Sequence, residues 1–349
     1  MIIALKYLNT TSSLPTTVYT LQKYVYKDIY SILIPKKMKI MIYTCNYYFH
    51  NIFNIVYGKS FKGWGRKRTG LFALWCYKTF GGELMLNEDG FIRSLGLGIQ
   101  GSSSFSIVED DMGIYYDAMT PSRLEYILNT YNFIEDNALM SMAKKAIHLI
   151  QQHNVSKYNN APDIETGFFN SDTRNKVLII AQTVGDASLK YGAGEIYSTK
   201  QMIDDAIRSN PNMSIYIKIH PDALTGKKVS DISEHDIPPL CTILDNDINP
   251  ISLLKYFDKV YTKTSGMGME ALILGLDVVC YGIPYYSGWG LTEDKQKCAR
   301  RKRVLSLEEL FAGAYILYTK YHNPHNKKIS NIIDTIYEIL EQKHKGIQN

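Results

Sequence analysis

The pattern of apolar and polar residues changes about halfway along the chain. In the second half, short continuous apolar runs alternate with helix-like segments. Such runs are typical of strands buried on both faces of a parallel sheet. The strands are expected at 177–181, 214–219, 259–262 and 278–281. The helices between them are expected at 199–208, 250–257 and 268–274. This alternation predicts a doubly wound α/β domain.

The first half follows a less regular pattern. Its apolar residues predict a buried strand at 39–45 and helices at 71–80, 120–131 and 139–152. Thr120 is expected to cap the second of these helices, with Pro121 in the first turn. A stretch rich in Asn, Ser, Pro, Gly and Asp follows at 154–173 and predicts an interdomain linker. Two more helices are expected at 307–320 and 329–342.

Composition narrows the class of protein. At 349 residues, 45% apolar and 21% charged, the chain has ordinary globular composition and length for two domains. Its five cysteines are scattered and form no CxxC pair, which argues against a disulfide scaffold or zinc site and predicts a reducing compartment. No stretch approaches the roughly 20 apolar residues of a membrane span, and no export signal is recognised, so we expect a cytoplasmic protein.

The net charge of +5 is partly carried by basic clusters at 36–39, 66–68 and 300–303. Such clusters can bind nucleic acid, anionic lipid or an acidic substrate, or can simply be solvated. Nucleic acid is disfavoured, because no recognised binding motif accompanies the charge. Contact of the basic clusters and the C-terminal helices with the anionic inner membrane stays an open hypothesis.

Candidate site residues follow from the predicted sheet, because ligands of open α/β sheets bind beyond the carboxyl ends of the strands. The residues at these ends are Gln182, Asp186, Ser188, Lys218, His220, Pro221, Thr264, Ser265 and Gly266. Thr264–Gly266 opens a predicted helix, and its hydroxyl and N–H groups suit a phosphate. Many turns have this composition, however, and a histidine such as His220 is often purely structural. Glu270, one turn further, is either a ribose-binding residue or an ordinary surface carboxylate.

The first half contributes a second candidate segment, at 87–94. Glu88 and Asp89 precede a glycine, two apolar residues and Arg93. A carboxyl placed in a cleft can act as an acid or base in glycosyl transfer. The alternative is an ordinary polar turn.

Several motifs together carry a resemblance to a known family. They are GWGRK (63–67), EDGFIRSLGLG (88–98), GIYYDAMTPSRLE (113–125), QTVGDASLKYG (182–192), YIKIHPD (216–222), TSGMGMEALILG (264–275), PYYSGWGLTED (284–294) and RRKRVLSLEEL (300–310). In this order the chain resembles the capsule-polysaccharide β-Kdo glycosyltransferases of the KpsC/LipA type. The best-known members carry two such modules in tandem, whereas this chain has one.

The resemblance implies an α/β, GT-B-like fold with two Rossmann-like lobes and an active site in the cleft between them. The acceptor-side domain would span residues 1–160, with 1–55 as a divergent extension. The CMP-sugar-binding domain would span 170–310, followed by a helical tail at 311–349. CMP-Kdo would be the donor and a glycan or glycolipid the acceptor, with no metal or other cofactor. Other capsule-synthesis proteins would be partners.

The resemblance also implies roles for individual residues. Asp186 would be the covalent nucleophile of a retaining reaction, oriented by Gln182 and Ser188. Glu88 would deprotonate the acceptor, with Asp89 as its substitute. The residues that would hold the donor are Lys218, His220, Pro221, Thr264, Ser265, Gly266 and Glu270, with Arg93 on the carboxylate of the sugar. Two alternatives remain: a sialyltransferase-like enzyme that uses another CMP-nonulosonate, and a non-catalytic subunit for capsule assembly.

Overall fold

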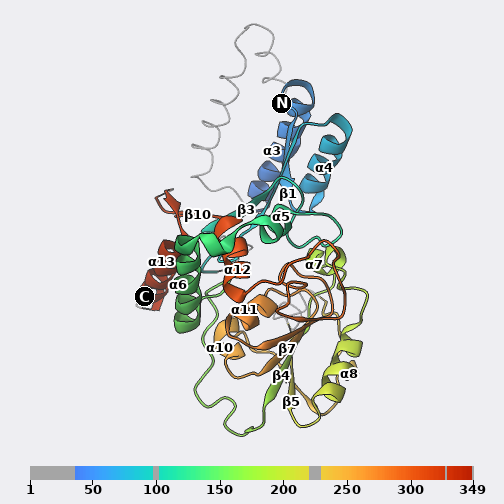
Figure 1. Cartoon of the computed structure of the whole chain (residues 1–349), viewed down its shortest axis with the longest axis vertical. Helices are drawn as coiled ribbons and strands as arrows, with labels where there is room; N and C mark the ends of the chain where they lie inside the picture. Colours follow the sequence, from blue (N-terminus) through green and yellow to red (C-terminus); the bar gives the residue numbers. More distant parts are fainter. Residues whose placement is uncertain (1–35, 97–101, 220–228, 327, 348–349) are drawn as a thin grey trace.

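The computed structural model describes residues 36–96, 102–219, 229–326 and 328–347. These residues form two lobes, each built on a β-sheet (Figure 1). Within them, the first sheet has five strands in the order β1-β2-β3-β10-β11, and the second has six in the order β6-β5-β4-β7-β8-β9. The chain is therefore an α/β protein with two sheets, as the sequence predicts.

The second lobe contains the predicted parallel sheet. Its strands are β4 (Lys176–Ile180), β5 (Ser214–Lys218), β6 (Cys241–Leu244), β7 (Lys259–Thr262), β8 (Asp277–Cys280) and β9 (Glu293–Asp294). All neighbouring pairs are parallel. Every residue of β4 and β5 is buried, which explains why both read as continuous apolar runs. The four strands expected from the sequence are confirmed to within one residue at either end.

The helices of this lobe connect and cover the strands. They are α7 (Ala187–Tyr191), α8 (Thr199–Ser209), α10 (Pro250–Leu254) and α11 (Met267–Ile273), with a short 3-10 turn η3 (Glu234–Asp236). A capping box formed by Ser198 and Gln201 fixes the start of α8. The helix expected at 250–257 ends earlier than predicted, at Leu254.

The first lobe is mixed. Its elements up to the linker are α3 (Lys36–Tyr57), β1 (Ser60–Trp64), α4 (Arg68–Phe80), β2 (Glu83–Asp89), β3 (Ser106–Asp110), α5 (Arg123–Thr130), η2 (Phe133–Glu135) and α6 (Asn137–His153). β1 and β2 are parallel, whereas β3 runs antiparallel to β2. This sheet brings the end of β2, with Glu88 and Asp89, to the side of the second lobe.

Two local predictions in this lobe are wrong. The segment 39–45 belongs to helix α3 and not to a buried strand. A short apolar run fits a buried helix as well as a strand, and the 22-residue length of α3 decides between them. The start of α5 is capped by Ser122, whose hydroxyl oxygen accepts a hydrogen bond from the backbone N–H of Glu125. Thr120 is therefore not the cap.

The C-terminal segment returns to the first lobe. It contains α12 (Leu307–Phe311), a π-helical continuation η4 (Ala312–Leu317), β10 (Thr319–His322), β11 (Ile329–Ser330) and α13 (Ile332–Ile347). β10 pairs antiparallel with β3 and with β11, and α13 packs against α6. The segment expected to be a helical tail therefore adds two strands to the first sheet. The alternating burial of β10 is the local sign of a strand that the helical interpretation missed.

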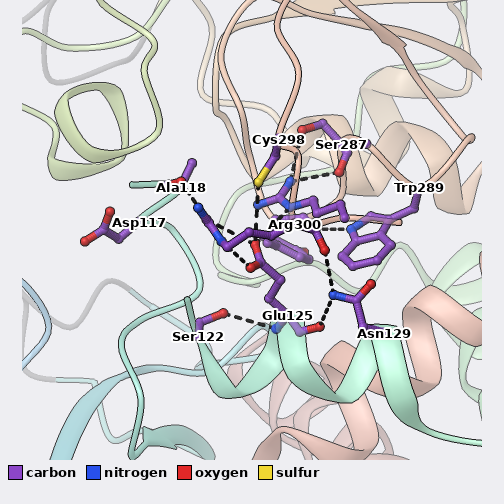
Figure 2. A network of polar contacts seen from close by, with 12 residues as sticks. Asp117, Ala118, Ser122, Glu125, Asn129, Ser287, Trp289, Cys298 and Arg300 are labelled. Carbon is purple, nitrogen blue, oxygen red and sulfur yellow. Dashed lines mark hydrogen bonds and ion pairs between the residues drawn. The ribbon is translucent and has the colours of Figure 1, made fainter. Parts of the chain in front are cut away.

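Ion pairs centred on the buried Glu125 join the two lobes (Figure 2). The carboxylate of Glu125, on α5, accepts a hydrogen bond from Arg300 Nε, with Oε1 and Nε 2.6 Å apart. Its other oxygen, Oε2, lies 3.4 Å from Arg301 Nε. Its side chain is 8% exposed and that of Arg301 is 3% exposed. Arg303 donates to the carbonyl oxygen of Tyr131. The three arginines of the basic cluster at 300–303 are thus engaged with α5 and the residues after it, whereas Lys302 is exposed.

Candidate active site

Two predicted motifs that are far apart in the sequence meet at the carboxyl ends of β4 and β7. Thr264 N donates to Gln182 Oε1 at 2.8 Å, and Gln182 Nε2 lies 3.1 Å from Thr264 Oγ1. The hydroxyls of Ser188 and Thr264 are 2.9 Å apart. Because β4 and β7 are adjacent parallel strands, their ends deliver these side chains to the same edge of the sheet.

This edge borders a cavity of about 470 Å³ that reaches into both lobes. The predicted site residues that line it are Gln182, Asp186, Ser188, Lys218, Thr264, Ser265, Gly266 and Glu270. Aromatic side chains also line the cavity, and the rings of two of them, Phe91 and Tyr285, have centroids 4.7 Å apart. A pocket with an apolar wall and a few converging polar groups is the usual form of a small-molecule site.

Asp186 and Lys218 contribute opposite charges to this cavity. Asp186 is exposed and caps the start of α7, where its Oδ1 accepts a hydrogen bond of 2.9 Å from the backbone N–H of Ser188. Lys218 is 7% exposed and donates to the carbonyl oxygen of Asn246 at 2.8 Å. Burial lowers the pKa of Lys218, while the nearby Asp247 and Asp245 oppose that shift. The cation inside the cavity can bind an anionic group of a ligand, while the accessible carboxylate can contact an uncharged part of the same ligand.

Glu270 is not the surface carboxylate that the sequence left open. It is 8% exposed, and it accepts a hydrogen bond from the hydroxyl of Ser156. Burial raises the pKa of Glu270 to about 7, although the bonds from Ser156 and from the backbone N–H of Lys157 act in the opposite direction. Glu270 therefore connects α11 to the linker while it lines the cavity.

Glu88 lies beside the cavity and is not part of its lining. Trp64 Nε1 donates to Glu88 Oε1 at 2.8 Å. At Gly65, which has φ +38°, a Cβ atom would lie 2.6 Å from Glu88 Oε2 and 2.3 Å from the hydroxyl of Tyr116, a cavity residue. Only glycine permits this close approach. Burial raises the pKa of Glu88, against the opposing charges of Lys67 and Lys157.

Asp89 and Arg93 are engaged with each other and do not line the cavity. Arg93 Nε lies 2.7 Å from Asp89 Oδ1, and Arg93 Nη1 donates to the hydroxyl of Ser94. Their predicted roles at the site therefore stay predictions. His220 and Pro221 lie outside the described residues, so their predicted roles stay predictions.

Lys157 is a cavity residue that the sequence analysis missed. It lies in the polar linker, and its ammonium forms no ion pair with any described residue. Its carbonyl oxygen accepts from the backbone N–H groups of Arg93 and Ser94, which holds the linker to the segment that follows Glu88. The charges of Tyr115, Tyr158, Asp89 and Glu88 outweigh burial and raise the pKa of Lys157. No local signal marks this lysine, because its position depends on how the linker crosses between the lobes.

The cavity thus offers hydroxyls, two lysines, an exposed carboxylate and an aromatic wall. Within the described ranges, no three His, Cys, Asp or Glu side chains are grouped as a metal site. The cations and hydroxyls suit an anionic group, and Asp186 suits nucleophilic attack on a carbon held near it.

Comparison with known proteins identifies relatives across most of the chain. A family model described as "Capsule polysaccharide biosynthesis protein" matches residues 80–322. The capsule polysaccharide modification protein LipA of Neisseria meningitidis serogroup A is 39% identical over 267 residues, which are 74% of this chain and 38% of LipA. The lipopolysaccharide-processing protein LpsZ of Rhizobium meliloti is 39% identical over 234 residues, which are 67% of this chain and 53% of LpsZ. This chain therefore spans only part of the length of these curated relatives.

Two solved structures from Thermosulfurimonas dismutans resemble the chain as well. The β-Kdo 2,4 transferase of KpsC has a TM-score of 0.76 at 40% identity, with 80% of this chain and 87% of that chain covered. The β-Kdo 2,7 transferase of KpsC has a TM-score of 0.66 at 29% identity, with 87% and 96% covered. The likeness confirms the predicted GT-B-like, two-lobe fold. Since the family model covers well over half of the chain, the protein belongs to the capsule polysaccharide biosynthesis protein family.

Proposed function

We propose that this chain is a retaining glycosyltransferase that transfers β-Kdo from CMP-Kdo to a lipid-linked or oligosaccharide acceptor in the synthesis of bacterial capsule or surface polysaccharide. The observation that carries the proposal is the cavity at the ends of β4 and β7. It is lined by eight of the residues that the resemblance assigns to catalysis and donor binding. The likeness to two β-Kdo transferase structures supports the same sugar.

The donor has two negative groups, and the cavity has a lysine for each. Lys218 and the hydroxyls of Thr264 and Ser265 are proposed to hold the phosphate of CMP and to stabilise it as it leaves. Lys157 is proposed to hold the carboxylate of Kdo, because it lines the cavity and its ammonium forms no ion pair with a described residue. Arg93, the residue expected from the sequence, is paired with Asp89 and does not line the cavity, so we propose Lys157 before it. Glu270 remains the candidate for the ribose.

The transfer would proceed in two displacements. In the first, the Asp186 carboxylate attacks the anomeric carbon, the bond from that carbon to the phosphate oxygen breaks, and CMP leaves with the bonding electrons. In the second, the acceptor oxygen attacks the same carbon, the bond to Asp186 breaks, and Asp186 regains its charge. Two inversions restore the original β configuration.

Glu88 is the proposed base of the second displacement. It would take the proton of the acceptor hydroxyl, and the pKa that burial raises makes it a better proton acceptor than an ordinary glutamate. Asp89 is less suited, because its carboxylate is paired with Arg93 at 2.7 Å. Glu88 lies next to Tyr116 on the first-lobe side, which is the side from which an acceptor would enter.

The decisive experiment is incubation of the purified chain with CMP-Kdo and synthetic Kdo-terminated acceptors, with analysis of the product by NMR. We expect CMP release and one new β-Kdo linkage. The 2,4 linkage is favoured, since the likeness to the 2,4 transferase is greater in both identity and TM-score. A donor panel tests the alternative of another CMP-nonulosonate. No CMP release with any donor and acceptor would favour the non-catalytic alternative.

A further inference from the structure

The tip of the first lobe carries an apolar surface on the outer side of α3. None of the described helices is long and apolar enough to cross a membrane. Yet Met41, Phe49, Ile52 and Val56 are 58%, 60%, 56% and 70% exposed. At 3.6 residues per turn these four positions fall within about 80° of the helix circumference. Large apolar side chains are therefore exposed as one continuous stripe and not as scattered residues.

The neighbouring helix α4 extends this apolar surface. α3 and α4 lie side by side at the end of the first lobe that is remote from the second sheet (Figure 1). The rings of Tyr48 and Phe72 are 5.1 Å apart, and Phe72 stacks on Trp75 at 5.9 Å. Trp75 is 52% exposed and Leu71 is 43% exposed. We call the exposed apolar side chains of these two helices the α3–α4 surface.

The charge around the α3–α4 surface is predominantly positive, and its nearest carboxylate in the sequence is the exposed Glu83, whose backbone N–H donates a hydrogen bond to the carbonyl oxygen of Lys59. Residues 36–82 contain nine lysine or arginine residues and no aspartate or glutamate. The whole chain has a net charge of only +5, so the rest of it is net negative. The exposed cations of this segment are Lys59, Lys62, Lys67, Arg68 and Lys78. None of them forms an ion pair with a described residue.

This combination points to one kind of partner. Exposed apolar and aromatic side chains on a helix face, flanked mainly by cations, are the features of a helix that lies in the interface of an anionic bilayer. A soluble acidic protein would suit the cations but not the length of the apolar stripe. A second copy of this chain would bring two cationic surfaces together, which is unfavourable.

We propose that the α3–α4 surface docks the protein on an anionic membrane, with the apolar stripe inserted at the level of the lipid headgroups. This differs from our sequence-based hypothesis, which used the 300–303 cluster and the C-terminal helices. The arginines of that cluster are engaged by Glu125 and nearby backbone carbonyls, and α13 packs against α6. The proposal does not depend on the transferase reaction.

The first test is flotation of the full chain with lipid vesicles. We expect the protein to float with vesicles that contain phosphatidylglycerol. With vesicles of pure phosphatidylcholine, it should remain unbound at the bottom of the gradient. Binding should fall steeply between 0.1 M and 1 M salt, where the screening length shortens from about 10 Å to about 3 Å. The triple variant Phe49→Ser/Ile52→Ser/Val56→Ser should lose at least about tenfold in affinity, and so should Lys59→Gln/Lys62→Gln/Lys78→Gln.

Matched control variants distinguish binding through the α3–α4 surface from nonspecific binding by other exposed apolar or basic side chains. Ile134→Ser/Val304→Ser removes apolar side chains that are 81% and 83% exposed elsewhere, and should leave vesicle binding unchanged. Lys144→Gln/Lys145→Gln/Lys200→Gln removes three exposed cations elsewhere and should have little effect. Equal losses in the controls, or a wild-type chain that does not float, would overturn the proposal.

A spectroscopic measurement locates the contact. Of the three tryptophans, Trp289 is buried and Trp64 donates to Glu88, which leaves Trp75 on the α3–α4 surface. Brominated lipids should quench wild-type fluorescence, and Trp75→Phe should remove that quenching. Quenching that persists in Trp75→Phe contradicts the proposed orientation. If the triple apolar variant instead converts a dimer to a monomer and no form binds vesicles, the surface contacts a second copy.

Discussion

Glu125 and Arg300 stand 175 residues apart in the sequence and form an ion pair of 2.6 Å between the lobes (Figure 2). The same carboxylate also pairs with Arg301, so the buried anion of Glu125 balances the charge of two arginines. Burial lowers the pKa of Arg301, which indicates how costly its charge is without a partner. The pair fixes α5 against the loop that follows β9.

Replacement of Glu125 by Gln is therefore expected to destabilise the chain strongly. Two guanidinium groups would lose the one carboxylate with which they pair among the described residues, and removal of one partner from a buried pair such as Glu125–Arg301 costs about 3–5 kcal/mol. Urea unfolding followed by circular dichroism measures this loss as a fall in the free energy of unfolding. The matched control is Asp111→Asn, which breaks the exposed 2.6 Å pair with Arg123 and should cost less than about 1 kcal/mol. Similar losses in both variants would contradict the importance of the interlobe pair.

Asp186→Asn should abolish transfer while leaving CMP binding intact. The amide oxygen of the variant can still accept a hydrogen bond from the backbone N–H of Ser188, so α7 keeps its cap. The amide cannot, however, form an ester with the sugar. Wild-type protein mixed with CMP-Kdo alone should show a Kdo-sized increase in mass by intact mass spectrometry, and the variant should not. Asp204→Asn, on the exposed side of α8, serves as the control and should behave as wild type. A fully active Asp186→Asn protein rules out the nucleophile role.

The sequence predicts the second lobe far better than the first, for a physical reason. Strands such as β4 and β5 are buried on both faces, so their apolar runs have one interpretation. Gln182 and Thr264 are both predicted at strand ends, and the structure brings them into hydrogen-bonding contact because parallel strands end at one edge of the sheet. Helix α3 and strand β10 have ambiguous local patterns and are decided by tertiary packing.

The same contrast applies to the candidate site. Lys157 lines the cavity only because the linker runs between the lobes, and no motif encodes that path. The arginines at 300–303 look like a solvated basic cluster until α5 supplies Glu125. Local patterns therefore predict the residues that a strand end presents, but not those that a distant segment brings in.

Glu88→Gln should reduce the rate of transfer far more than Asp89→Asn. Removal of a general base costs about a hundredfold or more, and Glu88 is the carboxyl whose pKa is raised by burial. Asp89 is paired with Arg93, so its loss should act mainly on stability. Transfer rates at saturating donor and acceptor, together with urea unfolding, separate the two effects. A larger rate loss in Asp89→Asn would reverse the assignment of the pair.

Lys157→Gln tests the contact with the sugar carboxylate. A charge-assisted hydrogen bond is worth about 1.5–3 kcal/mol, so the affinity for CMP-Kdo should fall about tenfold to a hundredfold. The affinity for CMP alone should be unchanged, because CMP lacks the carboxylate. Calorimetry with the two ligands gives both values, and Lys190→Gln, an exposed lysine outside the cavity lining, is the control. An equal loss for both ligands would place Lys157 on the nucleotide instead.

Glu270 should make stability depend on pH in the direction opposite to an ordinary paired carboxylate. Its pKa is raised from 4.5 to about 7, chiefly by burial, so the folded chain holds this proton more tightly than the unfolded chain. The resulting stabilisation is fully present below pH 4.5 and is lost as pH rises through 7.

A shift of this size corresponds to about 3 kcal/mol of free energy of unfolding. Glu270→Gln keeps an acceptor for Ser156 but cannot ionise, so it should remove that dependence. Urea unfolding of both proteins at about pH 5 and about pH 8 cancels the shifts of all other groups. The wild type should lose more stability than the variant over this interval. If the two proteins instead follow parallel curves, the buried carboxyl does not titrate in this window, and Glu270 must be ionised in the folded chain throughout.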